Sequence, residues 1–357
     1  MMLPEELLAG PRGRRLLLEL AEHLSDEVRM LAFGLSYELD PGKGTSRVLM
    51  RFDDGRGEPE ADPPAPTVDA FVRALADIDL ARVTPAMLDA ALGASMDGAM
   101  YWQPPSGEGV LSALPEVVDA LRPLAAAAAQ HPPAWWSADR RIEQWAIEWR
   151  DPGDPVPLGA DAAAALQKWK DSALADEARA ARERPTDVTA NWSGTWWSTP
   201  SGMVATTGVT DAATPAGLRY VEDSFGWEAA TAIPVRGAGR TYEIHTAQDW
   251  AELCRRFPLE VTASRRHDWY RTTGRDGRWV IPDWARVAGE WDAVHLSACG
   301  YLGGATRAID IDDERASVIA GWSPDLVVWL TGSVREWEGP RVQWRCSDDR
   351  WVRADAP

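Results

Sequence analysis

The stretch RIEQWAIEWR, residues 141–150, alternates apolar and polar side chains over most of its length. This alternation places Trp145, Ile147 and Trp149 on one face of an extended chain, which predicts a half-buried strand. Before this stretch, apolar residues recur mainly at helical spacing, whereas short strand-like runs dominate from residue 191 onward. We therefore predict an α+β fold, with a helix-rich N-terminal α+β region followed by a mainly antiparallel β C-terminal domain with a few helices.

Shifts in composition divide the chain further. The run DPGDPVPLG, residues 151–159, is rich in proline and glycine, and a charge-rich helix is expected after it, over residues 161–184. All 20 tryptophans lie between Trp102 and Trp351. We predict three parts: a helix-rich α+β domain over 1–155, a connecting helix and linker over 156–190, and a tryptophan-rich mixed β domain over 191–357.

Local patterns in the N-terminal region predict helices and one hairpin. Apolar residues at helical spacing predict helices over 12–24, 84–96 and 107–130. Two strand-like runs, 31–39 and 46–54, are joined by a turn-rich segment and predict a β-hairpin.

Composition and charge exclude several classes of protein. The 357 residues contain 55 acidic and 37 basic side chains, a net charge of −18, which makes duplex nucleic acid an unlikely partner. No apolar run approaches the roughly 20 residues that cross a bilayer, so we expect no membrane partner and a cytoplasmic location. Three scattered cysteines favour neither a disulfide framework nor a cysteine metal site.

The densest group of chemically versatile side chains is SRRHDWYR, residues 264–271, in a stretch expected to be rich in loops. Its arginines can bind phosphate or carboxylate in a forked manner, and its aromatic rings can stack on a base or sugar. A phosphate-bearing small molecule is therefore one hypothesis for a ligand. The alternative is that these arginines pair with the protein's own surplus of carboxylates.

A second candidate is WDAVHLSACGY, residues 291–301. An aspartate three residues before a histidine can orient an imidazole that acts as a general base. Residues three apart on a strand point to opposite faces, so Asp292 can assist His295 only if it lies in the turn before the strand. The spacing of the histidines and acidic residues fits no metal-ligand pattern, so no metal site is predicted.

The C-terminal domain resembles RNA 2'-phosphotransferases, which belong to the ADP-ribosyltransferase fold. The runs VHLS, RAIDID and VVWLTGSV, starting at Val294, Arg307 and Val327, follow the order of three strands in that family. The run EWE, residues 336–338, is similar to the Glu-x-Glu element of other members. The resemblance implies NAD bound in a cleft, with Glu336 or Glu338 polarising the ribose and an arginine holding the pyrophosphate.

Two functional hypotheses follow. The first is an enzyme, a transferase that binds a nucleotide or other phosphate-bearing small molecule in the C-terminal domain, with NAD as a candidate cofactor. The second is a non-catalytic interaction or regulatory protein that binds a protein partner through an acidic, tryptophan-rich surface, including the Trp-Trp pairs 135–136 and 196–197. The candidate catalytic residues are His267, Tyr270, His295 and Glu338, and the candidate ligand-binding residues are Arg265, Arg266, Trp269 and Arg271.

Overall fold

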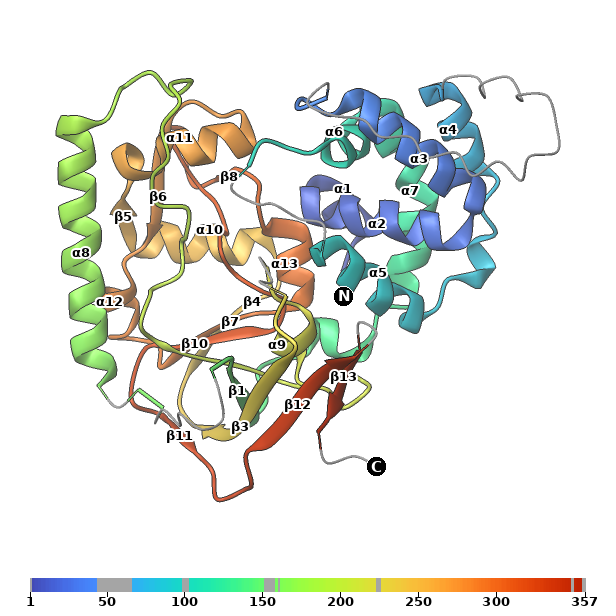
Figure 1. Ribbon diagram of the computed structural model, residues 1–357. Helices are drawn as coiled ribbons and strands as arrows, with labels where there is room; N and C mark the ends of the chain where they lie inside the picture. The colour runs from blue at the N-terminus through green and yellow to red at the C-terminus, as the bar shows by residue number, and fades with distance from the viewer. Residues whose placement is uncertain are drawn as a thin grey trace.

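A computed structural model of the chain describes residues 2–43, 66–97, 103–150, 158–159, 161–222, 226–347 and 350–354. A group of helices formed by the first third of the chain lies beside a part that contains the sheets (Figure 1). Within the described residues the first group comprises α1 (Pro4–Ala9), α2 (Pro11–Leu24), α3 (Asp26–Leu39), α4 (Val68–Ala76), α5 (Pro85–Asp97), α6 (Gly107–Ala113) and α7 (Pro115–Gln130), with the short 3-10 turns η1 (Leu80–Arg82) and η2 (Ala134–Ser137).

The helices predicted over 12–24 and 84–96 are confirmed as α2 and α5. The helix predicted over 107–130 is two helices, because Pro115 cannot continue α6 and instead occupies the first position of α7.

The predicted strand over 31–39 is wrong, because these residues belong to α3. Ser25 caps this helix by accepting a hydrogen bond from the Val28 amide, and Val28, Ala32 and Leu35 are buried at helical spacing. The cap lies outside the window that suggested a strand. The partner strand predicted over 46–54 falls outside the described residues.

The second part holds most of the strands, together with α8 to α13. The helices are α8 (Ala162–Glu183), α9 (Ala216–Arg219), α10 (Ala247–Arg256), α11 (Thr262–Thr273), α12 (Trp284–Val287) and α13 (Ala298–Gly304). The strands are β1 (Glu143–Glu148), β2 (Val204–Thr207), β3 (Ala229–Gly237), β4 (Thr241–Ile244), β5 (Pro258–Glu260), β6 (Arg278–Pro282), β7 (Ala293–Leu296), β8 (Ile309–Asp310), β9 (Arg315–Ser317), β10 (Leu326–Trp329), β11 (Val334–Glu336), β12 (Val342–Ser347) and β13 (Arg350–Arg353).

The large sheet has the order β13-β12-β3-β1-β2-β10-β7-β4, and β11 pairs with β3. Its strands are antiparallel to their neighbours except for β4 and β7, which are parallel. A smaller sheet has the order β5-β6-β9-β8. The α+β fold with a mainly antiparallel second half is therefore confirmed.

Strand β1 confirms the alternation that the sequence predicted. Trp145, Ile147 and Trp149 pack on one face with Leu218 and Trp344. The strand pairs with β2 on one side and β3 on the other. The sheet therefore takes a central strand from the chain before residue 155, where we expected a domain to end.

The two halves share one apolar core. Helix α13 contacts both α1 and α2, and Tyr301 and Leu302 belong to the same buried cluster as Leu17. In the second half, Trp250, Trp284 and Trp322 are fully buried, with ring centroids 5.8–6.1 Å apart. Across the part of the chain that the structure describes, no helix combines the length and apolar character needed to span a membrane.

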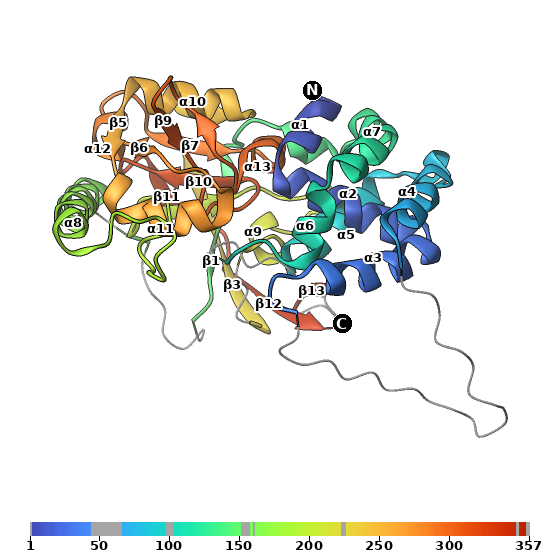
Figure 2. The ribbon, with the colours of Figure 1, turned by 90° about the horizontal axis from the view of Figure 1, so that it is seen from above.

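The sheet at β4 and β7 has one face in the main apolar core and another, called the polar face here, on which Glu243 and His295 lie beside a small apolar cluster of Ala293, Val327 and Trp329. Ile244, Val294 and Leu296 are buried in the core shared with α10 and α13, which lie over this end of the sheet (Figures 1 and 2). Glu243, which precedes Ile244, and His295, which lies between Val294 and Leu296, are register partners and project from the opposite face.

The end of β3 provides a test of the packing on the polar face. A Cβ atom at Gly237 would overlap the buried ring of Trp329, whose indole N–H donates to Thr206 Oγ1 at 2.8 Å. We expect Gly237→Ala to lower the free energy of unfolding by about 1–3 kcal/mol, measured by chemical denaturation. Gly332→Ala is the control, because a Cβ there meets no atom within 4 Å. Equal stability of the two variants would contradict the packing.

Candidate metal centre

The end of strand β4 places two potential metal ligands on the polar face of the sheet: Glu243 lies in the strand, and His245 follows directly after its last residue. Glu243 and His245 are two residues apart and so project to the same side, whereas Ile244 between them is buried in the core. Unlike the buried Ile244, both side chains reach solvent: 23% of the Glu243 side chain and 32% of the His245 side chain are accessible.

A third potential ligand comes from the segment between η2 and β1. Arg140 fixes this segment to the sheet, because its backbone N–H donates to Glu243 Oε1 at 3.2 Å and its Nε donates to Thr241 Oγ1 at 2.5 Å. Its guanidinium also lies over the ring of Trp329, 5.0 Å from the centroid. Asp139 is thereby held against His245, with 3.0 Å between Oδ1 and Nε2.

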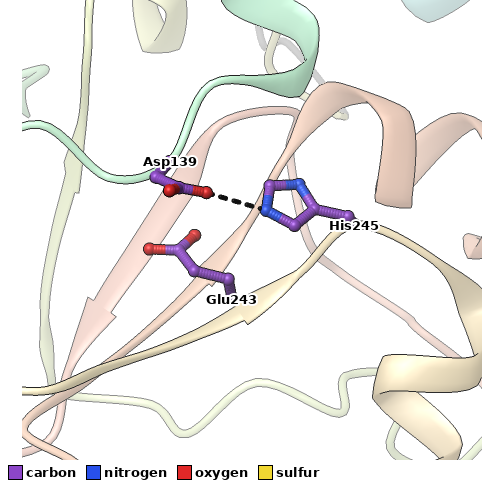
Figure 3. Close-up of side chains that lie close together, drawn as sticks. All are labelled: Asp139, Glu243 and His245. Carbon is purple, nitrogen blue, oxygen red and sulfur yellow. Dashed lines mark hydrogen bonds and ion pairs between the residues drawn. The ribbon is translucent and has the colours of Figure 1, made fainter. Parts of the chain in front are cut away.

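The side chains of Asp139, Glu243 and His245 converge from these two segments (Figure 3). One ligand atom from each lies within 4.8 Å of the others. Carboxylate oxygen and imidazole nitrogen together suit divalent ions such as Zn²⁺, Mn²⁺ and Fe²⁺. Three protein ligands, with 78% of the Asp139 side chain exposed, leave room on the solvent side for a further ligand.

A buried imidazole orients Glu243. The ring of His295 is fully buried, with Nδ1 2.5 Å from Glu243 Oε2 and Nε2 3.1 Å from Asp325 Oδ1. The other oxygen of Asp325 accepts hydrogen bonds from the Gly208 amide at 2.6 Å and the Thr207 hydroxyl at 3.0 Å. The imidazole therefore links Glu243 to a second carboxylate that is itself fixed by hydrogen bonds.

The charge balance of this network favours a cation. Burial disfavours the charged imidazole, but hydrogen bonds to Asp325 and Glu243 outweigh burial and raise the pKa of His295 to about 9. The carboxylates of Asp139, Glu243 and Asp325 outnumber the two cations, His295 and Arg140, before His245 is counted. The ligands and their neighbours therefore carry together one more negative than positive charge.

His295, one of the candidate catalytic residues predicted from the sequence, belongs to this network. Its partners do not include the one expected, Asp292. Asp292 precedes β7, as the hypothesis required, but its carboxylate accepts hydrogen bonds from the Arg240 amide and from the hydroxyls of Thr331 and Ser333. Glu243 and Asp325 contact the imidazole in its place.

The run 264–271 is helical and not a loop, because it forms most of α11. Arg265 and Trp269 are buried, and their N–H groups donate to the backbone carbonyls of Trp197 and Trp196 at 3.2 and 2.9 Å. Arg271 donates to the Trp192 carbonyl at 2.6 Å. These three side chains hold the segment 192–197 against the helix.

The remaining candidates lie apart from the His295 network. His267 is buried, and burial followed by the charge of Arg266 lowers its pKa. Tyr270 and Arg266 are half-buried on α11, and Glu338 is exposed after β11. None of the eight candidates lines the two pockets that adjoin β4 and β10.

The Trp135–Trp136 pair proposed for a partner surface is buried, and both indoles donate to Asp89 Oδ1.

Sequence reasoning missed Asp139, Glu243 and His245 as a group. The signal for two of them is present in TYEIHT, residues 241–246, because alternation places Glu243 and His245 on one face. Asp139 is 106 residues from His245, and no local pattern connects them.

The pocket next to β4 is lined in part by His245 and has a volume of about 450 Å³. One potential metal ligand therefore also faces a space large enough for a small molecule.

Comparison with protein-family models finds no match, and comparisons with curated proteins and with solved structures find none either. The ADP-ribosyltransferase-like relationship therefore stays a prediction.

The His295 network predicts a specific loss of stability. His295→Asn removes the charge between Glu243 and Asp325, so we expect the free energy of unfolding to fall by about 3–5 kcal/mol at neutral pH. Because the folded pKa of His295 is raised to about 9, its stabilising contribution is complete below about pH 6.5 and is lost as the pH rises through 9. The free energies of unfolding of wild type and variant, measured by urea denaturation, should therefore differ less and less as the pH rises from 6.5 to 9. A constant difference across this range would contradict a charged imidazole.

Proposed function

We propose that the chain is an enzyme that binds a divalent metal ion through Asp139, Glu243 and His245 and acts on a phosphate-bearing small molecule. The observation that carries this proposal is the convergence of three ligand atoms of suitable type within 4.8 Å. The hydrogen bond between Asp139 and His245 shows that their side chains already meet, so both can bind one ion with small rotations.

The surrounding residues support a defined role for each ligand. His295 and the Arg140 amide each contact one oxygen of Glu243, so this carboxylate is fixed before an ion binds. Partners of this kind orient metal ligands and strengthen metal binding. A divalent ion at this position would supply a Lewis acid with coordination sites open to water or substrate oxygen.

The substrate class follows from charge and from the adjoining pocket. Phosphate oxygens are favourable ligands for a divalent ion, and the pocket that His245 lines provides space for the rest of the molecule. A nucleotide such as NAD meets this requirement. The proposal therefore retains the transferase class and the cofactor that the sequence suggests, with the reacting group placed at β4.

Metal binding by variants tests the proposal. Titration of Zn²⁺ or Mn²⁺ into chelator-treated wild-type protein, followed by calorimetry, should show one site. Glu243→Gln and His245→Ala each remove a ligand, so affinity should fall by more than the roughly 10- to 100-fold that loss of an outer partner costs.

His131→Ala is the matched control, because His131 is exposed at the end of α7, away from the three ligands. Circular dichroism checks that each variant is folded. Absence of metal binding by the wild type, or equal affinity in all three variants, would overturn the proposal.

A further inference from the structure

The pocket beside β4 lies where the two halves of the chain meet. Its walls come from α1, from the residues just after β4 and the first turn of α10, from α13, and from β8 with the two residues before it. The side chains that bear on its chemistry are Glu6, His245, Gln248, Cys299, Arg307 and Asp310.

Arg307 is a half-buried cation in the pocket wall without a direct partner. Within the described residues its guanidinium forms no hydrogen bond, and no carboxylate lies within 4.0 Å of it. Its Nε is buried and lacks an acceptor, and burial lowers the pKa of the side chain. Glu6 and Asp310 attract it only through space, and Glu6 accepts a hydrogen bond from the Leu3 amide at 2.8 Å.

A second guanidinium lies near Arg307 outside the pocket lining, so two cations balance the two carboxylates, Glu6 and Asp310, that line the pocket. Arg14 on α2 is half-buried, and its Nη1 donates to the carbonyls of Leu8 and Ala9 at 2.8 and 3.1 Å. Burial and then repulsion by Arg307 lower the pKa of Arg14, and its Nε is also buried without an acceptor. Two neighbouring guanidinium groups with unmet hydrogen-bonding capacity are stabilised when an anion binds between or beside them.

The first turn of α10 adds backbone donors to the same wall. Thr246, Ala247 and Gln248 line the pocket, and the first amides of a helix have no acceptor within the helix. Thr246 caps this helix by accepting from the Asp249 amide, and the Asp249 carboxylate in turn accepts from the amides of His245 and Thr246. This carboxylate offsets part of the positive potential of the helix end, so Arg307 carries most of the attraction.

We propose that this pocket binds the anionic group of a small molecule, a phosphate or a carboxylate, with Arg307 as its principal partner. A guanidinium binds either group through two parallel N–H donors. That this molecule is the substrate rests on the proposed function, because His245 belongs to both the pocket and the metal centre. Binding of the anion itself needs no metal ion.

Anion titration of the full chain tests the site. Inorganic phosphate, pyrophosphate and succinate are titrated by calorimetry into protein stripped of metal on a chelating resin. We expect saturable binding of at least one of them. Arg307→Met should lower the affinity for the anion at least tenfold. Arg307→Lys keeps the charge but loses the two parallel N–H donors of the guanidinium, so its affinity should lie between those of wild type and Arg307→Met. The stronger of the phosphate and succinate responses identifies the anionic group.

Two further variants separate this site from the metal centre. Arg182→Met is the matched control, because Arg182 is an exposed arginine on α8, and it should bind the anion as wild type does. Glu243→Gln should also retain anion binding while losing metal affinity, so failure of either proposal leaves the other measurable. Absence of binding of all three anions by wild type, or equal affinity in Arg307→Met and Arg182→Met, would overturn the inference.

Discussion

The imidazole of His295, buried between two carboxylates, is the interaction on which the arrangement of the sheet at its polar face depends. It joins Glu243 on β4 to Asp325 before β10, and Asp325 continues the connection to the Gly208 amide after β2. Asp325 adopts φ of 62°, an unusual conformation for a residue with a Cβ atom, which the network holds in place. A single charged ring thus links four strands of the large sheet.

This network also explains why the candidate metal centre is placed at β4. Strand β4 faces the apolar core through Ile244 and the polar cluster through Glu243, and His245 follows directly after the strand. Packing of Ile244 under α10 fixes the strand, so the two polar residues have defined positions. Arg140 then brings Asp139 to the site by its contacts with Thr241 and Glu243.

The sequence was informative where local spacing decides structure. Helices α2 and α5 and strand β1 follow from apolar spacing, but residues 31–39 were misassigned because the deciding cap, Ser25, lies upstream of them. In α11, a run rich in arginine suggested a ligand site, whereas the buried side chains of Arg265 and Trp269 bind a neighbouring segment. The candidate metal centre joins residues more than 100 positions apart, and that proximity depends on strand pairing that composition does not encode.

The pocket at the junction of the two halves has a thermodynamic consequence. Glu6 belongs to the N-terminal helices, whereas Arg307 and His245 belong to the sheet-containing part. A molecule that contacts both parts binds best when they are docked as observed, so its binding free energy adds to the free energy of docking. By the reciprocity of linked equilibria, the factor by which docking of the two parts strengthens binding of such a molecule equals the factor by which the bound molecule favours docking.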